Sequence, residues 1–443
     1  MAFLSLGKVK SAAMNTLHGG VLPIAIDFGV GSLKLLQLAT GDPPSLIAAA
    51  SIDTPEALLS DHAKRFEFQF QALARLLKGA GFKGKRAVCS IPAGQTFIKH
   101  MQFPRNDNVD LAELVATGVP AALNCAPDAL ILRHYAVEGA ATPGSGAGRE
   151  AAGTGGAKQE VICMAAAREF VQRLMQGIRE ARLECVGIHP EAVATINAFE
   201  HINRRVGDQH VSTLYLDLAC GTTKVWIAHA STLIFAKTIQ IGGRDLDAAV
   251  ARATNLDTAA ARAKRLGAAV LVAPAARPAN CTSPQGDGVA QPALVAMSAD
   301  GTPDPLAKSD PATLTAEDRR AGRIAPGLTP QVADQGASPV APPEFDLADT
   351  LDNLTDEIAM CLRYYEAMFP GRRVDRAIFF GGESRHRGLC QHVARKIRLP
   401  AHVADPLARM ARTGSEPVRG VDFTTPQPGW TIPFGLCMSP TDL

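Results

Sequence analysis

The chain has 443 residues, of which 47% are hydrophobic and 20% are charged, and its formal net charge is +2 at pH 7. This length exceeds what a single hydrophobic core usually supports, so two domains are expected. The composition is that of an ordinary globular protein, and so small a net charge gives no support for a nucleic-acid partner.

The cysteines and the apolar runs indicate the cellular compartment in which the protein resides. Nine cysteines are scattered singly, with no Cys-x-x-Cys pair, which predicts neither a disulfide framework nor a structural zinc site and favours a reducing cytoplasm. No apolar run approaches the roughly 20 residues that span a bilayer. Residues 1–20 lack the uninterrupted apolar core of a signal peptide, so we interpret them as a solvated leader rather than a membrane-surface helix.

The first predicted element is a β-hairpin at 24–38, made of two apolar strands and a tight turn. In and beside the turn are a carboxylate, two glycines, a hydroxyl and a lysine: Asp27, Gly29, Gly31, Ser32 and Lys34. Backbone N–H groups and a hydroxyl next to a carboxylate suit a phosphate and its metal ion. The alternative is that Asp27 accepts hydrogen bonds within its own turn and Lys34 faces solvent.

The next elements predict an α/β layer that carries an insertion. The layer continues with a strand at 45–52, a helix at 61–79, and strands at 87–91 and 97–103. The pattern then changes to a helix at 110–124, strands at 129–137 and 160–167, and a helix at 168–184. We therefore predict an inserted subdomain at 104–184, with the Gly/Ala/Ser/Thr-rich stretch 139–158 as a flexible loop. A strand at 186–189 and a helix at 191–203 lead to the second half.

A second hairpin, at 214–227, repeats the first in matching register. Counted from its aspartate, each hairpin has Gly at the fourth following position, Ser or Thr at the fifth and Lys at the seventh. The second set is Asp217, Gly221, Thr222, Thr223 and Lys224. Two similar halves facing one ligand would point Asp27 and Asp217 at the same Mg²⁺–nucleotide, with the ion held through water.

The rest of the second half alternates clear elements with one long aperiodic segment. The clear elements are a strand at 233–239, a helix that begins within 242–247, helices at 256–266, 345–369 and 389–397, and strands at 376–380 and 401–403. Residues 267–343 are dense in Ala, Pro, Gly, Asp and Ser, which predicts a disordered insertion. Gly242 with Gly243, and Gly381 with Gly382, would let backbone approach an adenine or ribose closely; ordinary glycine-rich loops are the alternative.

Glu191 is the one candidate for a catalytic residue. It begins a predicted helix directly after a buried strand, where its carboxylate could orient a water for attack on a γ-phosphate. The alternative, which we favour, is a carboxylate that stabilises the helix N-terminus. The sequence therefore leaves ATP hydrolysis open, as a weak activity at most.

These motifs together resemble those of the actin-like ATPase superfamily. The two aspartate turns resemble the phosphate motifs of that superfamily. Gly242-Gly243-Arg244-Asp245-Leu246 and Gly381-Gly382-Glu383-Ser384 resemble its phosphate and adenosine motifs. Within the superfamily the chain looks most like the PilM family, which is itself similar to FtsA. The PilM-like features include Ser90-Ile91-Pro92, Phe103-Pro104, Arg133–Val137, Cys185–Pro190, Leu399-Pro400 and Ala404-Asp405-Pro406. The resemblance covers 22–266 and 345–440; Ala219 departs from it by replacing the usual glycine of the second turn.

The resemblance implies a duplicated, ribonuclease H-like fold around ATP and Mg²⁺. Domain 1 would span 22–205 and domain 2 would span 210–443, with the C-terminal segment packing back on domain 1. Glu383 would join the nucleotide-binding residues.

The same resemblance implies a role in a type IV pilus or related secretion assembly. The chain would be a cytoplasmic ATP-binding adaptor, peripheral at the inner membrane, that binds the cytoplasmic N-terminal peptide of a membrane-anchored, PilN-like partner and other pilus components. The groove for this peptide would involve the inserted subdomain. Two other classes stay open: a filament former or membrane scaffold like FtsA, and a small-molecule kinase of the same fold.

Overall fold

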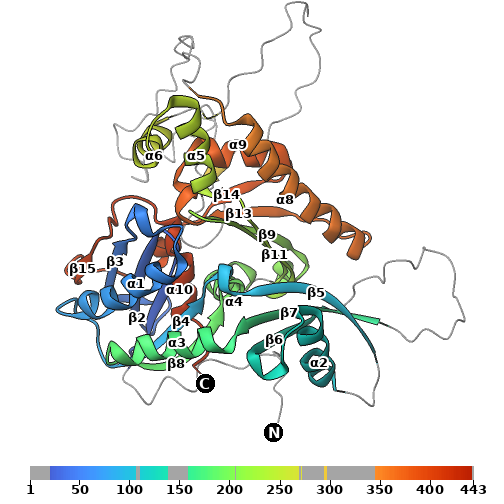
Figure 1. Ribbon diagram of the computed structural model, residues 1–443, viewed down its shortest axis with the longest axis horizontal. Coiled ribbons are helices and arrows are strands. Elements are labelled where there is room, and N and C mark those ends of the chain that lie inside the picture. The colour runs from blue at the N-terminus through green and yellow to red at the C-terminus, as the bar shows by residue number, and fades with distance from the viewer. Residues whose placement is uncertain are drawn as a thin grey trace, which may run out of the picture.

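The computed structural model describes residues 20–105, 110–137, 158–204, 206–268, 271, 294–296 and 345–441. The predicted leader and most of the segments 139–158 and 267–343 lie outside these residues. Across the described ranges the chain forms two six-stranded sheets and one three-stranded sheet, with helices on their faces (Figure 1). No helix among the described residues is both long and apolar enough to span a membrane.

The two large sheets share one plan. Across the first sheet lie β15 (Val418–Arg419), β3 (Ser45–Asp53), β2 (Ser32–Ala39), β1 (Ile24–Phe28), β4 (Arg86–Ile91) and β8 (Glu184–Pro190). Across the second lie β11 (Thr232–Ile239), β10 (Thr223–His229), β9 (Ser212–Leu218), β13 (Arg376–Phe380), β14 (Ala401–Val403) and β12 (Leu294–Ala296). In each sheet the first strand of the predicted hairpin pairs antiparallel with the second and parallel with a strand from further along the chain. The repeat confirms the predicted duplicated α/β fold.

Side-chain caps begin several of the helices. They are α1 (His62–Leu77), α2 (Leu111–Leu123), α3 (Arg168–Glu180), α4 (Glu191–Ala198), α5 (Gly243–Thr254), α6 (Thr258–Gly267), α8 (Ala348–Met368), α9 (Arg387–Ile397) and α10 (Thr431–Cys437). The Asp61 carboxylate accepts a hydrogen bond from the Lys64 backbone N–H at the start of α1, and Asp257 does the same for Ala260 in α6. The predicted helix at 191–203 ends early, at Ala198, and continues as a 3-10 turn over Glu200–Asn203.

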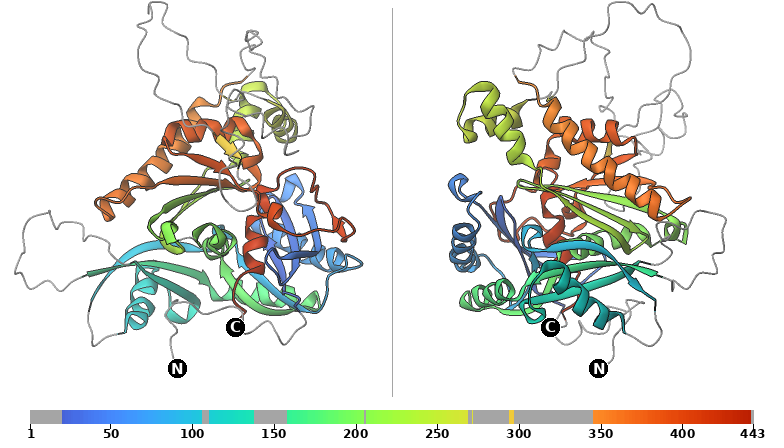
Figure 2. Two further views of the ribbon diagram at one scale, coloured as in Figure 1. Left: turned by 180° about the vertical axis from the view of Figure 1, so that it is seen from behind. Right: turned by 45° about the vertical axis from the view of Figure 1, so that its right-hand side comes forward.

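The three-stranded sheet corrects the boundaries of the insertion predicted at 104–184. Its strands are β5 (Phe97–Pro104), β7 (Lys158–Ala167) and β6 (Leu130–Val137), in that order. β5 was expected in the first sheet, but it pairs with β7. At the other end, α3 packs Leu174 and Ile178 into the core of the first half beside Phe66. The separate sheet and its helix α2 therefore span 97–167, and they lie beside β11 of the second half (Figure 2).

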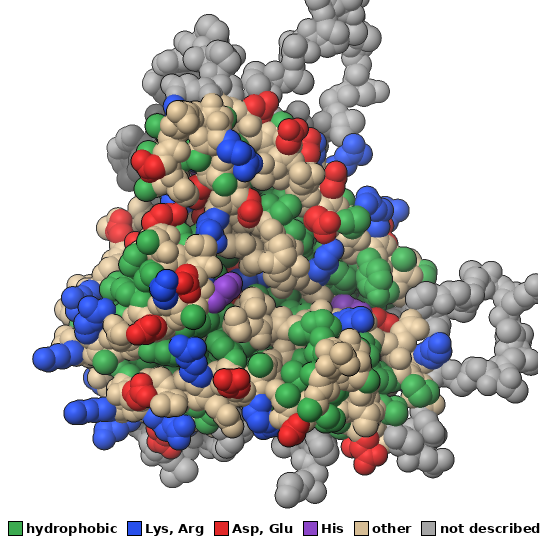
Figure 3. Space-filling model, viewed as in Figure 1, with side chains coloured by type: hydrophobic (Ala, Val, Ile, Leu, Met, Phe, Trp, Pro, Cys, Tyr) green, Lys and Arg blue, Asp and Glu red, His purple; other side chains and the backbone are tan. Residues whose placement is uncertain are grey.

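The C-terminal helix α10 leaves the second half and packs on the first. All seven of its residues are buried, and it contacts α4, β1 and β2. The approach to α4 is very close, since a Cβ on Gly435 would lie 1.7 Å from the Ala194 carbonyl oxygen. On the face shown in Figure 3, basic and acidic side chains are interspersed over both halves.

Gly435→Ala should lower the free energy of unfolding by about 1–3 kcal/mol, because the new methyl group meets backbone that cannot rotate away. Urea unfolding of the full chain measures this change. Gly207→Ala is the matched control, since a Cβ there meets nothing within 4 Å. Equal stabilities for the two variants would show that α10 does not pack against α4 in this way.

Candidate nucleotide site

The turns of the two hairpins lie against each other at the boundary between the halves. A Cβ on Gly31 would lie 3.4 Å from the Cβ of Cys220, and one on Gly221 would lie 3.4 Å from a methyl of Val30. Within each hairpin the aspartate stands opposite the lysine, Asp27 opposite Lys34 and Asp217 opposite Lys224. The structure thus brings the two predicted motifs together at one place.

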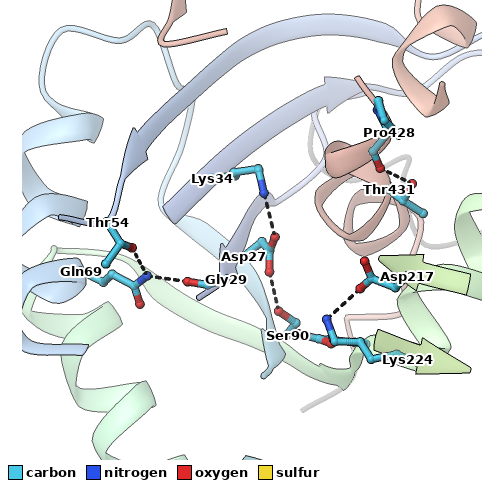
Figure 4. Close-up of polar contacts among 11 residues, drawn as sticks. Asp27, Gly29, Lys34, Thr54, Gln69, Ser90, Asp217, Lys224, Pro428 and Thr431 are labelled. Carbon is cyan, nitrogen blue, oxygen red and sulfur yellow. Dashed lines mark hydrogen bonds and ion pairs between the residues drawn. The ribbon is translucent and has the colours of Figure 1, made fainter. Parts of the chain in front are cut away.

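Both aspartates are buried beside this boundary (Figure 4). The Asp27 carboxylate accepts a hydrogen bond from Ser90 Oγ at 3.3 Å and lies 3.8 Å from Lys34 Nζ. Burial raises the pKa of Asp27 above its ordinary value, although Lys34 and Lys224 oppose this shift, and the charge of Asp217 adds to it. The negative charge of Asp217 therefore acts on Asp27 across the boundary between the halves.

Lys224 joins the two halves. Its ammonium lies 2.7 Å from an Asp217 oxygen and 2.9 Å from an oxygen of Glu191, which begins α4 in the first half. Although burial opposes the charge, Asp217 and Glu191 raise the pKa of Lys224 above its ordinary value. Lys224 is only 7% exposed, so it does not face solvent. The Lys224 ammonium thus donates a hydrogen bond to Asp217 and forms an ion pair with Glu191.

Glu191 is buried as well as paired. Burial raises its pKa above the ordinary value, with Asp217 and Asp27 adding to the shift and Lys224 opposing it. A raised pKa suits a general base. The ion pair with Lys224, however, holds the Glu191 carboxylate in place between the two halves.

One glycine of each predicted pair lies against a carboxylate of the protein itself. Gly381 has φ +91°, a conformation that favours glycine, and a Cβ there would lie 2.2 Å from Asp217 Oδ1. A Cβ on Gly243 would lie 2.3 Å from Glu383 Oε1, and Gly242 packs as closely on the second turn. Gly382 differs from these three, because it is exposed and a Cβ there would meet nothing within 4 Å. The side of Gly382 where a side chain would stand is therefore open, whereas its backbone N and Cα lie beside Gly429.

Glu383 belongs to a buried ion-pair network that sequence reasoning missed. The Arg265 guanidinium, fully buried on α6, donates to Glu383 at 2.8 Å and to Asp247 of α5 at 2.6 Å. This network ties the two helices to the loop after β13. The sequence does contain a signal for this buried arginine: Arg265 lies four residues after Ala261, on the apolar face of α6.

The remaining predicted residues line the turns themselves. The Gly29 carbonyl accepts a hydrogen bond from Gln69 of α1 at 2.7 Å. Ser32 and Thr222 are half-buried, and within the described part of the chain their hydroxyls form no hydrogen bond. Thr223 is buried at the start of β10. The free hydroxyls are donors of the kind that bind phosphate oxygens.

The charges at the site fit a divalent cation better than a bare triphosphate. Three carboxylates, those of Asp27, Asp217 and Glu191, share the two ammonium groups of Lys34 and Lys224. A cation would offset the remaining negative charge and the repulsion of phosphate. In the part of the chain that is described, no three Asp, Glu, His or Cys side chains converge closely enough to hold a metal, so Mg²⁺ would be bound through water.

Two halves with this strand plan, and with an aspartate turn from each at the boundary, show the actin-like fold that the sequence predicts. A solved structure described as a PilM-PilN type IV pilus biogenesis complex matches with a TM-score of 0.62 and 17% sequence identity, over 95% of this chain and 98% of that one. EutJ from Carboxydothermus hydrogenoformans, an ethanolamine utilization protein, gives 0.42 and 11%, over 94% and 89%. MreB5 of Spiroplasma citri bound to ADP gives 0.39 and 12%, over 93% and 94%. No protein-family model and no curated protein matches the sequence.

Proposed function

We propose that this chain is a cytoplasmic ATP-binding adaptor of a type IV pilus or related secretion assembly, held at the inner membrane through a PilN-like partner. The observation that carries the proposal is the contact between the two turns, each of which follows a buried aspartate, Asp27 in one half and Asp217 in the other. The fold, shared with the PilM-PilN complex, supports the pilus setting.

In this proposal the two turns bind the phosphates of ATP. The hydroxyls of Ser32 and Thr222 would donate to phosphate oxygens, and Lys34 would add a positive charge. Mg²⁺ would be held through water by Asp27 and Asp217, and it would neutralise the phosphates. Because Lys224 holds the Glu191 carboxylate, we expect ATP hydrolysis to be slow or absent.

A groove of about 730 Å³ between α1 and α3 is the proposed site for the partner peptide. It differs from the groove predicted from sequence, because α3 only packs against the separate sheet of the insertion and is not part of it. Phe70 and Gly177 supply an apolar floor, and a Cβ on Gly177 would meet the Phe70 ring at 2.4 Å. Three carboxylates line the groove, those of Glu67, Glu169 and Glu180, against the one guanidinium of Arg173. The groove therefore suits an extended peptide with an apolar anchor and basic side chains.

Helix α1 connects this groove to the phosphate turns. Gln69 donates to the Gly29 carbonyl in the first turn, while the neighbouring Phe70 faces the groove. A ligand that moves the turn would therefore move the wall of the groove. This contact supports partner binding that depends on nucleotide.

The test uses a synthetic peptide that carries one apolar anchor between basic side chains, the chemistry that the groove suits. Phe70→Ala and Glu169→Lys should each weaken its binding to the full chain about tenfold, through loss of an apolar contact and through charge reversal. Fluorescence anisotropy with and without Mg–ATP gives the affinities. Glu366→Lys, on the exposed face of α8, is the matched control. Unchanged binding by both groove variants would remove the proposed peptide site.

A further inference from the structure

Two arginines from opposite halves meet beside the phosphate turns. Arg65 lies in the first turn of α1, and Arg244 lies in the first turn of α5. Both guanidinium groups donate to the same carbonyl oxygen, that of Leu59, at 3.1 and 3.4 Å. Like charges are therefore held close together across the boundary between the halves.

These cations are not neutralised by the protein. Arg65 is 2% exposed, its Nε has no hydrogen-bond partner, and its Nη2 contacts His62 at 2.9 Å. Neither Arg65 nor Arg244 forms an ion pair with any carboxylate of the described residues. Burial first, and then Arg244, lower the pKa of Arg65 from its ordinary value. An anion at this place would offset a buried positive charge that now costs free energy.

The pair sits directly on both phosphate turns. The Arg244 backbone N–H donates to the Cys220 carbonyl of the second turn at 2.8 Å. One helical turn after Arg65, Gln69 donates to the Gly29 carbonyl of the first turn. An anion between the two guanidinium groups would consequently touch α1 and α5 beside the site that already suits phosphates.

We propose that Arg65 and Arg244 bind the terminal phosphates of a nucleoside triphosphate, one arginine from each half. This inference rests on the proposed nucleotide function. Charge-assisted bonds from guanidinium to phosphate are stronger than the bonds to the neutral Leu59 carbonyl that they would replace. The triphosphate would thereby hold the two halves together, and a nucleotide with fewer phosphates would do so less well.

Calorimetric titration of the full chain with ATP, ADP and AMP, all with Mg²⁺, tests the inference. Arg65→Gln and Arg244→Gln should each weaken ATP binding about tenfold or more and leave AMP binding within about twofold. Arg262→Gln is the matched control, because Arg262 lies at the same boundary but already pairs with Glu56, 4.0 Å away. This control should bind all three nucleotides as the unmodified chain does.

Thermal melting of the ligand-free variants separates ligand binding from a structural role. Arg244→Gln removes one of two repelling cations, so its melting temperature should not fall, whereas a structural arginine would lower it. Should Arg65→Gln fail to fold, Arg65→Lys and the half-buried Arg244 decide the matter.

Equal weakening of ATP, ADP and AMP, or none, would overturn the assignment of these arginines and leave nucleotide binding intact. An unmodified chain that binds none of the three nucleotides would overturn the proposed function as well.

Discussion

Lys224→Met should lower the free energy of unfolding at pH 7 by about 3–5 kcal/mol, because it leaves the buried carboxylates of Asp217 and Glu191 without their partner. Urea unfolding measures the loss. Lys237→Met is the matched control: Lys237 pairs with Glu357 near the surface, and its loss should cost less than about 1 kcal/mol. The buried bridge between the halves, rather than the removal of a lysine as such, would then account for the difference.

The cost of Lys224→Met should also depend on pH. Burial raises the folded-state pKa of Glu191 and Asp27 above the unfolded value, so their ionised forms destabilise the fold at neutral pH. Loss of Lys224 raises these pKa values further. The deficit relative to the unmodified chain should therefore be largest at pH 7 and should shrink as pH falls through the raised values towards the ordinary carboxyl range near about 4. If the difference in unfolding free energy is constant between pH 5 and pH 7.5, Lys224 does not stabilise buried, ionised Glu191 and Asp27 in this way.

Asp27→Asn and Asp217→Asn should each weaken Mg–ATP binding by about 10–100-fold, the usual effect of losing a group that orients a metal ion's ligands. Competition with a fluorescent ATP analogue measures this. Repeating the titration in EDTA should abolish the difference between these variants and the unmodified chain, since the carboxylates act through the ion. Asp349→Asn, on the exposed first turn of α8, serves as the control.

Unchanged Mg–ATP affinity in both aspartate variants would contradict the proposed role of the two turns. A loss of affinity that persists in EDTA would show that the carboxylates do not act through Mg²⁺. Weakening in one variant alone would mean that a single half binds the nucleotide.

The hairpins could be predicted from sequence because their signals are local. Asp27 and Asp217 each lie in an apolar strand that leads into a glycine-containing turn. Residues within each hairpin determine both its turn and the register in which its two strands pair. The pairing of β5 with β7 could not be predicted in the same way. Residues 97–104 read as a strand, but the choice of partner depends on packing against residues more than 50 positions away.

The sequence places most of the predicted site residues in or beside two turns, but it does not show the contacts that they make. Nothing in the sequence around Lys224 shows that its ammonium reaches Glu191 in the other half, since that contact depends on how the halves pack. The same holds for Arg65 and Arg244, which are ordinary helix residues until the two halves place them on one carbonyl. Local patterns identify turns and helices, whereas charge pairing between halves follows only from the tertiary fold.

Anomalous diffraction from crystals of the full chain grown with Mn²⁺ and ATP tests the central claim most directly, because Mn²⁺ stands in for Mg²⁺ and scatters anomalously. We predict a single Mn²⁺ peak between Asp27 and Asp217, at about 4 Å from both carboxylates as a water-bridged ion requires, with the phosphates against the two turns. A nucleotide bound elsewhere, or an Mn²⁺ that contacts the carboxylate of only one half, would contradict the account.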